Sequence, residues 1–213
     1  MPGLNAWLVH YSTDYVFDGT KTTPYVEDDQ PNPLSVYGQT KLAGERAIQQ
    51  VGGNHLIFRT SWVYGARGKN FLLTMLRLAR ERDELRIVND QHGAPTWSRS
   101  IAEATAQILA QCQSPFSSDS KFLTQLSGIY HLTCAGETTW FDFAQAIIDR
   151  SSNQSPSNPA MKKPKMVPIT TDQYPTPAKR PRHSTLANEK VAEAFGIALP
   201  SWSQALDMCL EGL

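Results

Sequence analysis

Tyr37 and Lys41, one helical turn apart, are the residues whose types and spacing most clearly indicate chemistry. They form a Y-x-x-x-K sequence inside a segment that predicts a helix, so both side chains lie on the same helix face. A phenol has a pKa of about 10, and a neighbouring ammonium lowers that pKa because it favours the phenolate. The pair is therefore suited to proton transfer near neutral pH.

Two residues with hydroxyl side chains precede this pair in the sequence, at the end of another predicted element. Ser12 and Thr13 follow an apolar segment that predicts a buried strand, and either hydroxyl could hydrogen-bond the substrate oxygen that Tyr37 protonates. Together these groups would polarise a carbonyl and protonate it while a nicotinamide cofactor delivers hydride. The Y-x-x-x-K sequence alone is a weak signal, and its structural alternative is a surface Tyr–Lys pair worth about 0.2–0.5 kcal/mol.

The elements that must position these groups alternate between strands and helices. Apolar and periodic segments predict strands at 6–11, 55–60, 85–88 and 128–132, and helices at 36–50, 70–82, 98–111, 138–150, 185–195 and 201–210. Polar sequences at 114–127 and 151–165 predict loops. The alternation indicates an α/β fold with a parallel sheet and covering helices, in which ligands bind beyond the carboxyl ends of the strands. The S-T-D residues at 12–14 and the R-T-S-W residues at 59–62 follow such ends, and we expect the site there.

Composition and charge exclude several classes of protein. Lys plus Arg and Asp plus Glu each total 20, so the formal net charge is zero and the basic surface that nucleic-acid binding requires is absent. The apolar runs are too short to span a bilayer, and the first ten residues lack the charged segment of a signal peptide. Cys112, Cys134 and Cys209 form no C-x-x-C pair, which favours reduced thiols. We predict a cytoplasmic protein without nucleic-acid or membrane partners.

Five blocks of this sequence resemble the dTDP-4-dehydrorhamnose reductase family of the extended short-chain dehydrogenase/reductases. They follow the family's order and span nearly the whole chain: S-T-D-Y-V-F-D-G (12–19), V-Y-G-Q-T-K-L-A-G-E (36–45), R-T-S-W-V-Y-G (59–65), N-D-Q-H-G-A-P-T (89–96) and T-P-A-K-R-P-R-H-S-T-L (176–186). The resemblance implies reduction of the C4 ketone of dTDP-4-dehydro-L-rhamnose by NADPH or NADH, giving the dTDP-L-rhamnose that feeds bacterial surface polysaccharides such as lipopolysaccharide. It also implies a partial Rossmann-like parallel sheet with a small C-terminal substrate-binding subdomain.

The resemblance assigns roles to residues of each block. It implies a catalytic set of Thr13, Tyr37 and Lys41. It implies a cofactor-binding set of Ser12, Tyr37, Lys41, Thr60 and Ser61, in which the lysine holds the nicotinamide ribose. It implies a substrate-binding set of Thr13, Asp14, Tyr15, Trp62 and Arg180, in which the tryptophan packs against the sugar and the arginine faces the diphosphate.

Histidines, glutamates and the other tryptophans suggest no further site. The sequence predicts no metal site, because its histidines lack the clustered spacing of metal ligands: His10, His92, His131 and His183. Some family members use glutamates near the G-A-P-T block for a metal-linked dimer, but here Arg99 lies close to that block and its charge disfavours a metal. We expect Trp97 and Trp140 to pack in the core or in an interface rather than against a ligand.

A glycine-rich turn, with which a dinucleotide fold approaches the pyrophosphate, does not occur in these residues as G-x-G-x-x-G or G-x-x-G-x-x-G. We therefore expect residues 1–112 to be the C-terminal half of a Rossmann-type domain and 113–213 a substrate-binding subdomain intertwined with it. The N-terminal half of the cofactor fold would be missing, which would weaken cofactor binding and reduce or abolish autonomous activity. The strand around Leu8 would then be an exposed apolar edge.

Two ways of completing such a fold follow from that edge. A complementing N-terminal fragment could pair with it, or a second copy of the chain could do so in a homodimer. The alternative to an enzyme is a non-catalytic nucleotide-sugar-binding or regulatory module that keeps the sugar pocket.

Overall fold

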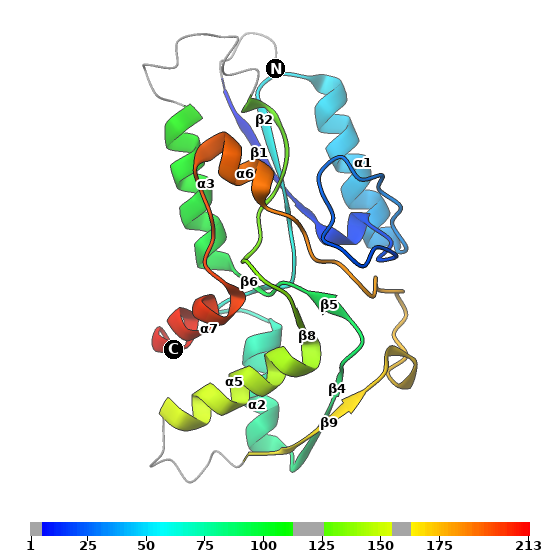
Figure 1. Cartoon of the computed structure of the whole chain (residues 1–213), viewed down its shortest axis with the longest axis vertical. Helices are drawn as coiled ribbons and strands as arrows, with labels where there is room; N and C mark the ends of the chain where they lie inside the picture. The colour runs from blue at the N-terminus through cyan, green and yellow to red at the C-terminus, as the bar shows by residue number, and fades with distance from the viewer. Residues whose placement is uncertain (1–5, 113–125, 155–162) are drawn as a thin grey trace.

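Three apolar segments form the parallel sheet that brings the predicted polar strand ends together. The strands are β1 (Leu8–Thr13), β2 (His55–Thr60) and β7 (Gly128–His131), in the order β1-β2-β7. The pairing register sets Thr13 opposite Thr60, so the carboxyl ends of the first two strands meet. The computed structural model describes residues 6–112, 126–154 and 163–213 (Figure 1).

Helices pack on both faces of this sheet and form a second layer beyond its carboxyl ends. They are α1 (Val36–Val51), α2 (Phe71–Glu81), α3 (Ser98–Cys112), α5 (Trp140–Gln154), α6 (Glu189–Phe195) and α7 (Trp202–Glu211). Figure 1 shows α1 on one side of the sheet, with α3 and α6 on the other. Leu56 and Phe58 of β2 pack against Ile108 of α3 and Val191 of α6. A second core joins α2, α5 and α7 through residues such as Leu72, Phe143 and Leu206.

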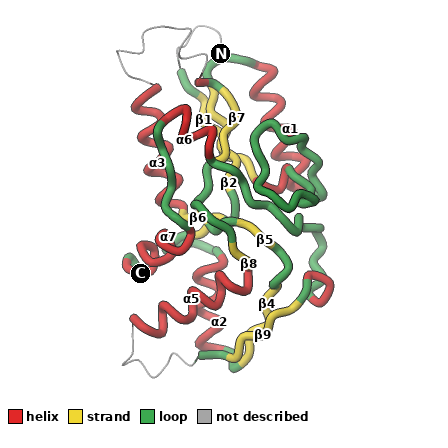
Figure 2. Tube along the Cα trace, in the orientation of Figure 1, coloured by secondary structure: helices red, strands yellow, loops and turns green. Residues whose placement is uncertain are grey.

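Short strand pairs connect the two layers, and 3-10 turns follow β1 and β9. The pairs are β3 (Val63–Tyr64) with β6 (Thr96–Trp97), β4 (Glu84–Val88) with β9 (Lys165–Ile169), and β5 (His92–Gly93) with β8 (Thr138–Thr139). The 3-10 turns are η1 (Asp14–Val16) and η3 (Thr171–Gln173). Figure 2 shows that loops and these short strands join the lower half of the molecule to the three-stranded sheet.

Most of the predicted elements are confirmed, and the differences have local causes. The helix predicted over 185–195 begins only at Glu189, because Leu186 is buried in a bridge with Tyr25. The helix predicted from 138 begins at Trp140, since Thr138–Thr139 first pair as β8.

The two predicted loops fall partly in ordered elements. Residues 151–154 continue α5, and the predicted loop at 151–165 otherwise lies largely outside the described residues, as does most of the predicted loop at 114–127. Strand β9 is not among the predicted elements, because Pro168 interrupts its apolar residues and argues against a strand.

Strand β1 forms the edge of the sheet, and within the described residues it pairs only with β2. Leu8 is 51% exposed and Tyr11 is 40% exposed, so the predicted apolar edge is confirmed. The three cysteines are free, as expected, and all three are buried. No helix in the described parts of the chain combines the length and apolar character needed to cross a bilayer.

A buried ion pair fixes helix α1 to the sheet. Arg59 of β2 donates to both carboxylate oxygens of Glu45 in α1, with a closest distance of 2.7 Å, and the two side chains are 2% and 1% exposed. The Ser12 hydroxyl of β1 donates to the same carboxylate. Removing one member of such a pair leaves a buried charge without compensation, which is more costly than losing an exposed pair.

We expect Glu45→Ala to lower the free energy of unfolding by about 3–5 kcal/mol, because Arg59 would keep its buried charge. The matched control is Glu81→Ala, which breaks the exposed Arg77–Glu81 pair within α2 and should cost about 1 kcal/mol or less. Urea unfolding followed by circular dichroism measures both. Equal losses in the two variants would contradict the role given to the buried pair.

Candidate active site

A cavity of about 330 Å³ lies at the carboxyl ends of β1 and β2. Its lining residues come from both strand ends, α1, α5 and a distant loop: Ser12, Thr13, Asp14, Tyr15, Tyr37, Thr60, Trp62, Val63, Trp140 and Arg180. All the residues that sequence reasoning assigned to a site are in this lining, except Lys41 and Ser61. The structure therefore brings the hydroxyls of Thr13 and Tyr37 to one cavity.

A larger cavity of about 560 Å³ adjoins the first, because Trp140 and Arg180 line both. It is bounded by residues of α2, by β4 and by residues 174–180. Arg82 and Arg86 add two more guanidinium groups to its lining. The two cavities together offer a small polar compartment beside a larger compartment with several cations.

Tyr37 is held at the rim of the smaller cavity by the first turn of α1. Ser35 caps this helix, its hydroxyl accepting a hydrogen bond from the Gly38 amide at 3.2 Å. A side chain at position 38 would place its Cβ 2.2 Å from the Tyr15 carbonyl oxygen, so only glycine allows this close approach of the helix. The Tyr37 ring meets the Tyr15 ring edge to face and remains 54% exposed, which leaves its hydroxyl open to a ligand.

Lys41 lies one turn farther along α1 and contacts the sheet rather than the cavity. Its ammonium donates a hydrogen bond to the Tyr11 carbonyl of β1. Thr13 and Tyr37 thus line one cavity and Lys41 does not, and the predicted convergence of the three groups on one substrate oxygen stays a prediction. The charge of Lys41 is anchored within one helical turn of the phenol.

Asp14 organises the hydroxyl groups at the strand ends. It is 2% exposed, and it accepts hydrogen bonds from Thr13 at 3.0 Å and from Ser61 at 2.9 Å. Burial raises the pKa of Asp14 to about 6, although hydrogen bonds from Ser184, Ser61 and Thr13 oppose this rise. Ser61 therefore supports the carboxylate from behind instead of lining the cavity.

Thr60 has a hydroxyl oxygen that is buried and lacks a hydrogen-bond partner among the described residues. This residue lines the smaller cavity together with Tyr37. A buried hydroxyl without a partner costs about 1–3 kcal/mol, and a polar group of a ligand in the cavity would remove this cost. The arrangement fits a polar ligand group at this position.

Two stacked tryptophans form one wall of the smaller cavity, and one of them, Trp140, also lines the larger cavity. The rings of Trp62 and Trp140 are parallel within 7°, with centroids 3.6 Å apart. Trp62 adopts a left-handed backbone with φ of 46°, which costs about 1–3 kcal/mol for a residue other than glycine. Gly93 permits this packing, because a Cβ there would lie 2.6 Å from the Trp62 ring. Trp140 packs against the second core, as expected, and it also lines both cavities.

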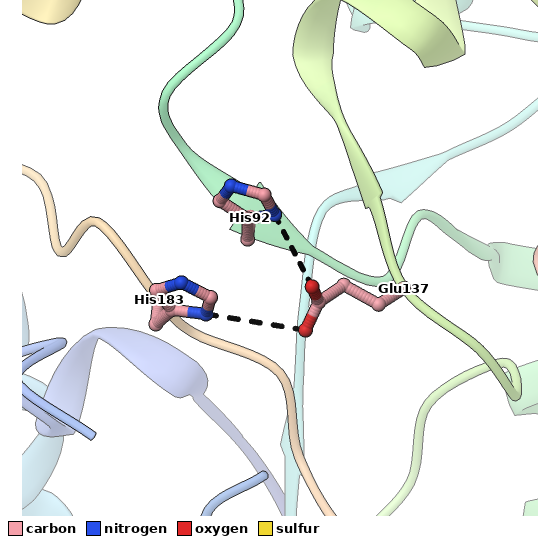
Figure 3. A group of neighbouring side chains, drawn as sticks. All are labelled: His92, Glu137 and His183. Carbon is pink, nitrogen blue, oxygen red and sulfur yellow. Dashed lines mark hydrogen bonds and ion pairs between the residues drawn. The ribbon is translucent and has the colours of Figure 1, made fainter. Parts of the chain in front are cut away.

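The sequence suggested that the histidines are scattered, but the structure brings two of them together with a glutamate. His92, Glu137 and His183 lie together on the surface (Figure 3), and each offers a ligand atom within 4.8 Å of the others. Separations of 45 residues between His92 and Glu137 and of 46 between Glu137 and His183 hid the group from spacing arguments.

Comparisons with known proteins agree with this geometry. The family described as RmlD substrate binding domain matches residues 3–213. The chain is 51% identical over 206 residues to a dTDP-4-dehydrorhamnose reductase of Burkholderia thailandensis, covering 97% of this chain and 67% of that protein. It is 45% identical over 210 residues to the reductase of the same name from Shigella flexneri, covering 99% of this chain and 67% of the relative.

A solved structure shares the fold. The dTDP-4-dehydrorhamnose reductase of Bacillus anthracis, in complex with NADP, matches with a TM-score of 0.84 at 31% identity, covering 98% of this chain and 66% of that one. The predicted α/β, Rossmann-like fold class is confirmed. The chain spans about two thirds of the length of these relatives.

The raised pKa of Asp14 predicts an unusual dependence of stability on pH. The folded state holds the Asp14 proton more tightly than the unfolded chain, where the pKa is near 3.8, so stability falls as pH rises from about 4 to about 6. Asp14→Asn avoids the buried charge, and we expect it to raise the free energy of unfolding by about 2 kcal/mol at pH 7.5 and by much less at pH 4. Urea unfolding at the two pH values measures the difference.

Asp18→Asn is the control with the opposite sign. Hydrogen bonds from Thr20 and Asn32 lower the pKa of Asp18 to about 2, so its ionised form supports folding at neutral pH. This variant should lose stability at pH 7.5. A gain for Asp14→Asn that is the same at both pH values would show that the buried charge is not its cause.

Proposed function

Since the chain belongs to the RmlD substrate-binding domain family, we propose that it binds a dTDP-4-keto-6-deoxyhexose and reduces its C4 ketone with NADPH or NADH. For dTDP-4-dehydro-L-rhamnose the product would be dTDP-L-rhamnose, made in the cytoplasm for surface polysaccharides. The observation that carries this proposal is the shared cavity of Thr13, Tyr37 and Thr60 beside the Trp62–Trp140 stack. The names of the 51% and 45% identical relatives support the reaction.

The chain's own residues would supply the proton and hold the ketone oxygen. The Tyr37 hydroxyl, open at the rim of the cavity, donates its proton to the C4 oxygen, which becomes the product hydroxyl. The anchored Lys41 ammonium stabilises the phenolate that remains. Thr13 now donates to Asp14, so it would rotate its hydrogen toward the C4 oxygen while Ser61 keeps the carboxylate hydrogen-bonded.

A nicotinamide cofactor, when bound, supplies the hydride for this reduction. The unpartnered Thr60 hydroxyl fits the polar groups of a nicotinamide or its ribose. Ser12 and Ser61, which the resemblance placed near the cofactor, would act indirectly, because their hydroxyls donate to Glu45 and Asp14. The glycine-rich turn that would hold the pyrophosphate is not among these 213 residues, and the weakened binding expected from this stays a prediction.

The two compartments suggest how the nucleotide sugar lies. The smaller cavity, about 330 Å³, would hold the keto sugar with one face against Trp62. Arg180 lines both compartments, so it would bind the diphosphate between them. The larger cavity, about 560 Å³, would then receive the nucleoside.

A non-catalytic nucleotide-sugar-binding module is the second candidate, and the larger cavity lined by Arg82, Arg86 and Arg180, which fits an anionic nucleotide without requiring turnover, is the observation that favours it. Such a module would keep both compartments but would not bind NADPH tightly. The exposed edge of β1, with Leu8 and Tyr11, is where a complementing segment or a second copy of the chain would pair to complete the cofactor site.

Removing the Tyr37 hydroxyl tests the reductase. We expect Tyr37→Phe to lower the turnover of dTDP-4-dehydro-L-rhamnose, followed by NADPH absorbance, by about 100-fold or more because the proton donor is lost. Its affinity for dTDP-L-rhamnose, measured by titration calorimetry, should stay near the unaltered chain's value. Tyr64→Phe is the matched control, since the Tyr64 hydroxyl is buried without a partner among the described residues and lies outside the smaller cavity.

The same assays separate the two candidates. Turnover by the unaltered chain that survives in Tyr37→Phe would reject the proton-donor role. Binding of dTDP-L-rhamnose with no turnover and no NADPH binding, even at high cofactor concentration, would favour the binding module. Failure to bind the nucleotide sugar would contradict both candidates.

A further inference from the structure

Two imidazoles and a carboxylate from three distant segments meet on the surface (Figure 3). His92 belongs to β5, Glu137 directly precedes β8, and His183 follows Arg180 by three residues. The Nδ1 atom of His92 lies 3.1 Å from one oxygen of Glu137, and the Nδ1 atom of His183 lies 4.0 Å from the other. All three ligand atoms fall within 4.8 Å of one another.

Main-chain hydrogen bonds hold these three residues in place. Strand β5 pairs with β8 so that His92 lies opposite Thr139. The His92 amide donates to the Arg182 carbonyl at 2.7 Å, and the Ser184 amide donates to the His92 carbonyl at 2.9 Å. The side chains can therefore be replaced one at a time without removing the contacts that bring the segments together.

The surroundings of Glu137 resemble the support that metal-binding carboxylates usually have. The Thr185 hydroxyl donates to one Glu137 oxygen at 2.7 Å, which orients the carboxylate toward the two rings. The imidazole planes are parallel within 2°, with centroids 4.4 Å apart, so both rings present a nitrogen to the same side. The three side chains are between 28% and 40% exposed, which leaves room for an ion to enter and for water to complete its coordination.

We propose that His92, Glu137 and His183 bind one divalent transition-metal ion of the zinc type. Two imidazole nitrogens and one carboxylate oxygen are the donors that Zn²⁺, Co²⁺ and Ni²⁺ favour, whereas Mg²⁺ and Ca²⁺ take oxygen donors. Bonds of about 2.0–2.1 Å to a tetrahedral ion place neighbouring donors about 3.3 Å apart. The observed histidine–glutamate separations of 3.1 and 4.0 Å bracket that value, and the two histidine nitrogens lie within 4.8 Å of each other, so side-chain rotations would bring the three donors to one ion.

The ion would join the Arg180 segment to the strands beside the cavities. His183 lies on the same short segment as Arg180, which lines both compartments. His92 is followed by Gly93, over which the Trp62 ring packs. A bound ion would therefore hold the rim of the site in position, a structural role that is independent of whether the chain turns over a ketone.

Metal titration of the whole chain, purified without a polyhistidine tag and stripped with a chelator, tests this site. We expect one equivalent of Zn²⁺ by titration calorimetry, and visible absorption bands of bound Co²⁺ that Zn²⁺ displaces. His92→Ala and His183→Ala should each lose affinity by about tenfold or more. His55→Ala is the matched control, because this partly exposed histidine bonds the Gly53 carbonyl and belongs to another part of the surface.

Folding and metal binding are separated by a second measurement. Circular dichroism should show the same secondary structure in all variants, and Zn²⁺ should raise the Tm of the unaltered chain and of His55→Ala but not of His183→Ala. No uptake of either ion, or equal uptake by His183→Ala and His55→Ala, would overturn the proposal and leave a hydrogen-bonded cluster only.

Discussion

The Glu45 carboxylate, buried between Arg59 of β2 and Ser12 of β1, sets how helix α1 lies on the sheet. Lys41 stands one turn earlier on the same helix and reaches the Tyr11 carbonyl of β1. Tyr37 stands about one turn before Lys41, at the rim of the cavity. Because the carboxylate is desolvated and its geometry is set by three donors, the helix has little freedom to rotate or slide. The position of the phenol is thus a consequence of a contact two turns away.

The hydroxyls at the strand ends depend on a second buried carboxylate that works against stability. Asp14 keeps its charge at neutral pH although burial raises its pKa to about 6, and Thr13 and Ser61 are oriented by their bonds to it. Trp62 adopts a left-handed backbone conformation, and stacking on Trp140 offsets the energetic cost of this conformation. Buried charges and unfavourable backbone conformations are found most often at sites that hold polar groups in position for a ligand. Here both features lie around the cavity that Tyr37 also lines.

The main helices and strands could be predicted from local features of the sequence. Contacts between segments that are distant in the sequence could not be predicted from such features. The strand at 55–60 and the helix that carries Tyr37 follow from apolar runs, periodicity and caps, and all three are local properties. The two-residue strands β5 and β8 have no periodicity to read, yet their pairing is what brings Glu137 to His92. Trp140 carries no mark in the sequence that distinguishes a cavity wall from a core position. The division at residue 112 stays a prediction.

One short segment links the features that sequence reasoning treated separately. Arg180 lines both cavities, and His183 belongs to the histidine–glutamate cluster. Ser184 hydrogen-bonds Asp14 and pairs through its amide with the His92 carbonyl, so the buried carboxylate and the cluster share a neighbour. Leu186 then anchors the segment in the core next to Tyr25. A displacement of this segment would move Arg180 at the cavities, His183 in the cluster and Ser184 beside the Asp14 carboxylate together, because these residues are neighbours in the chain.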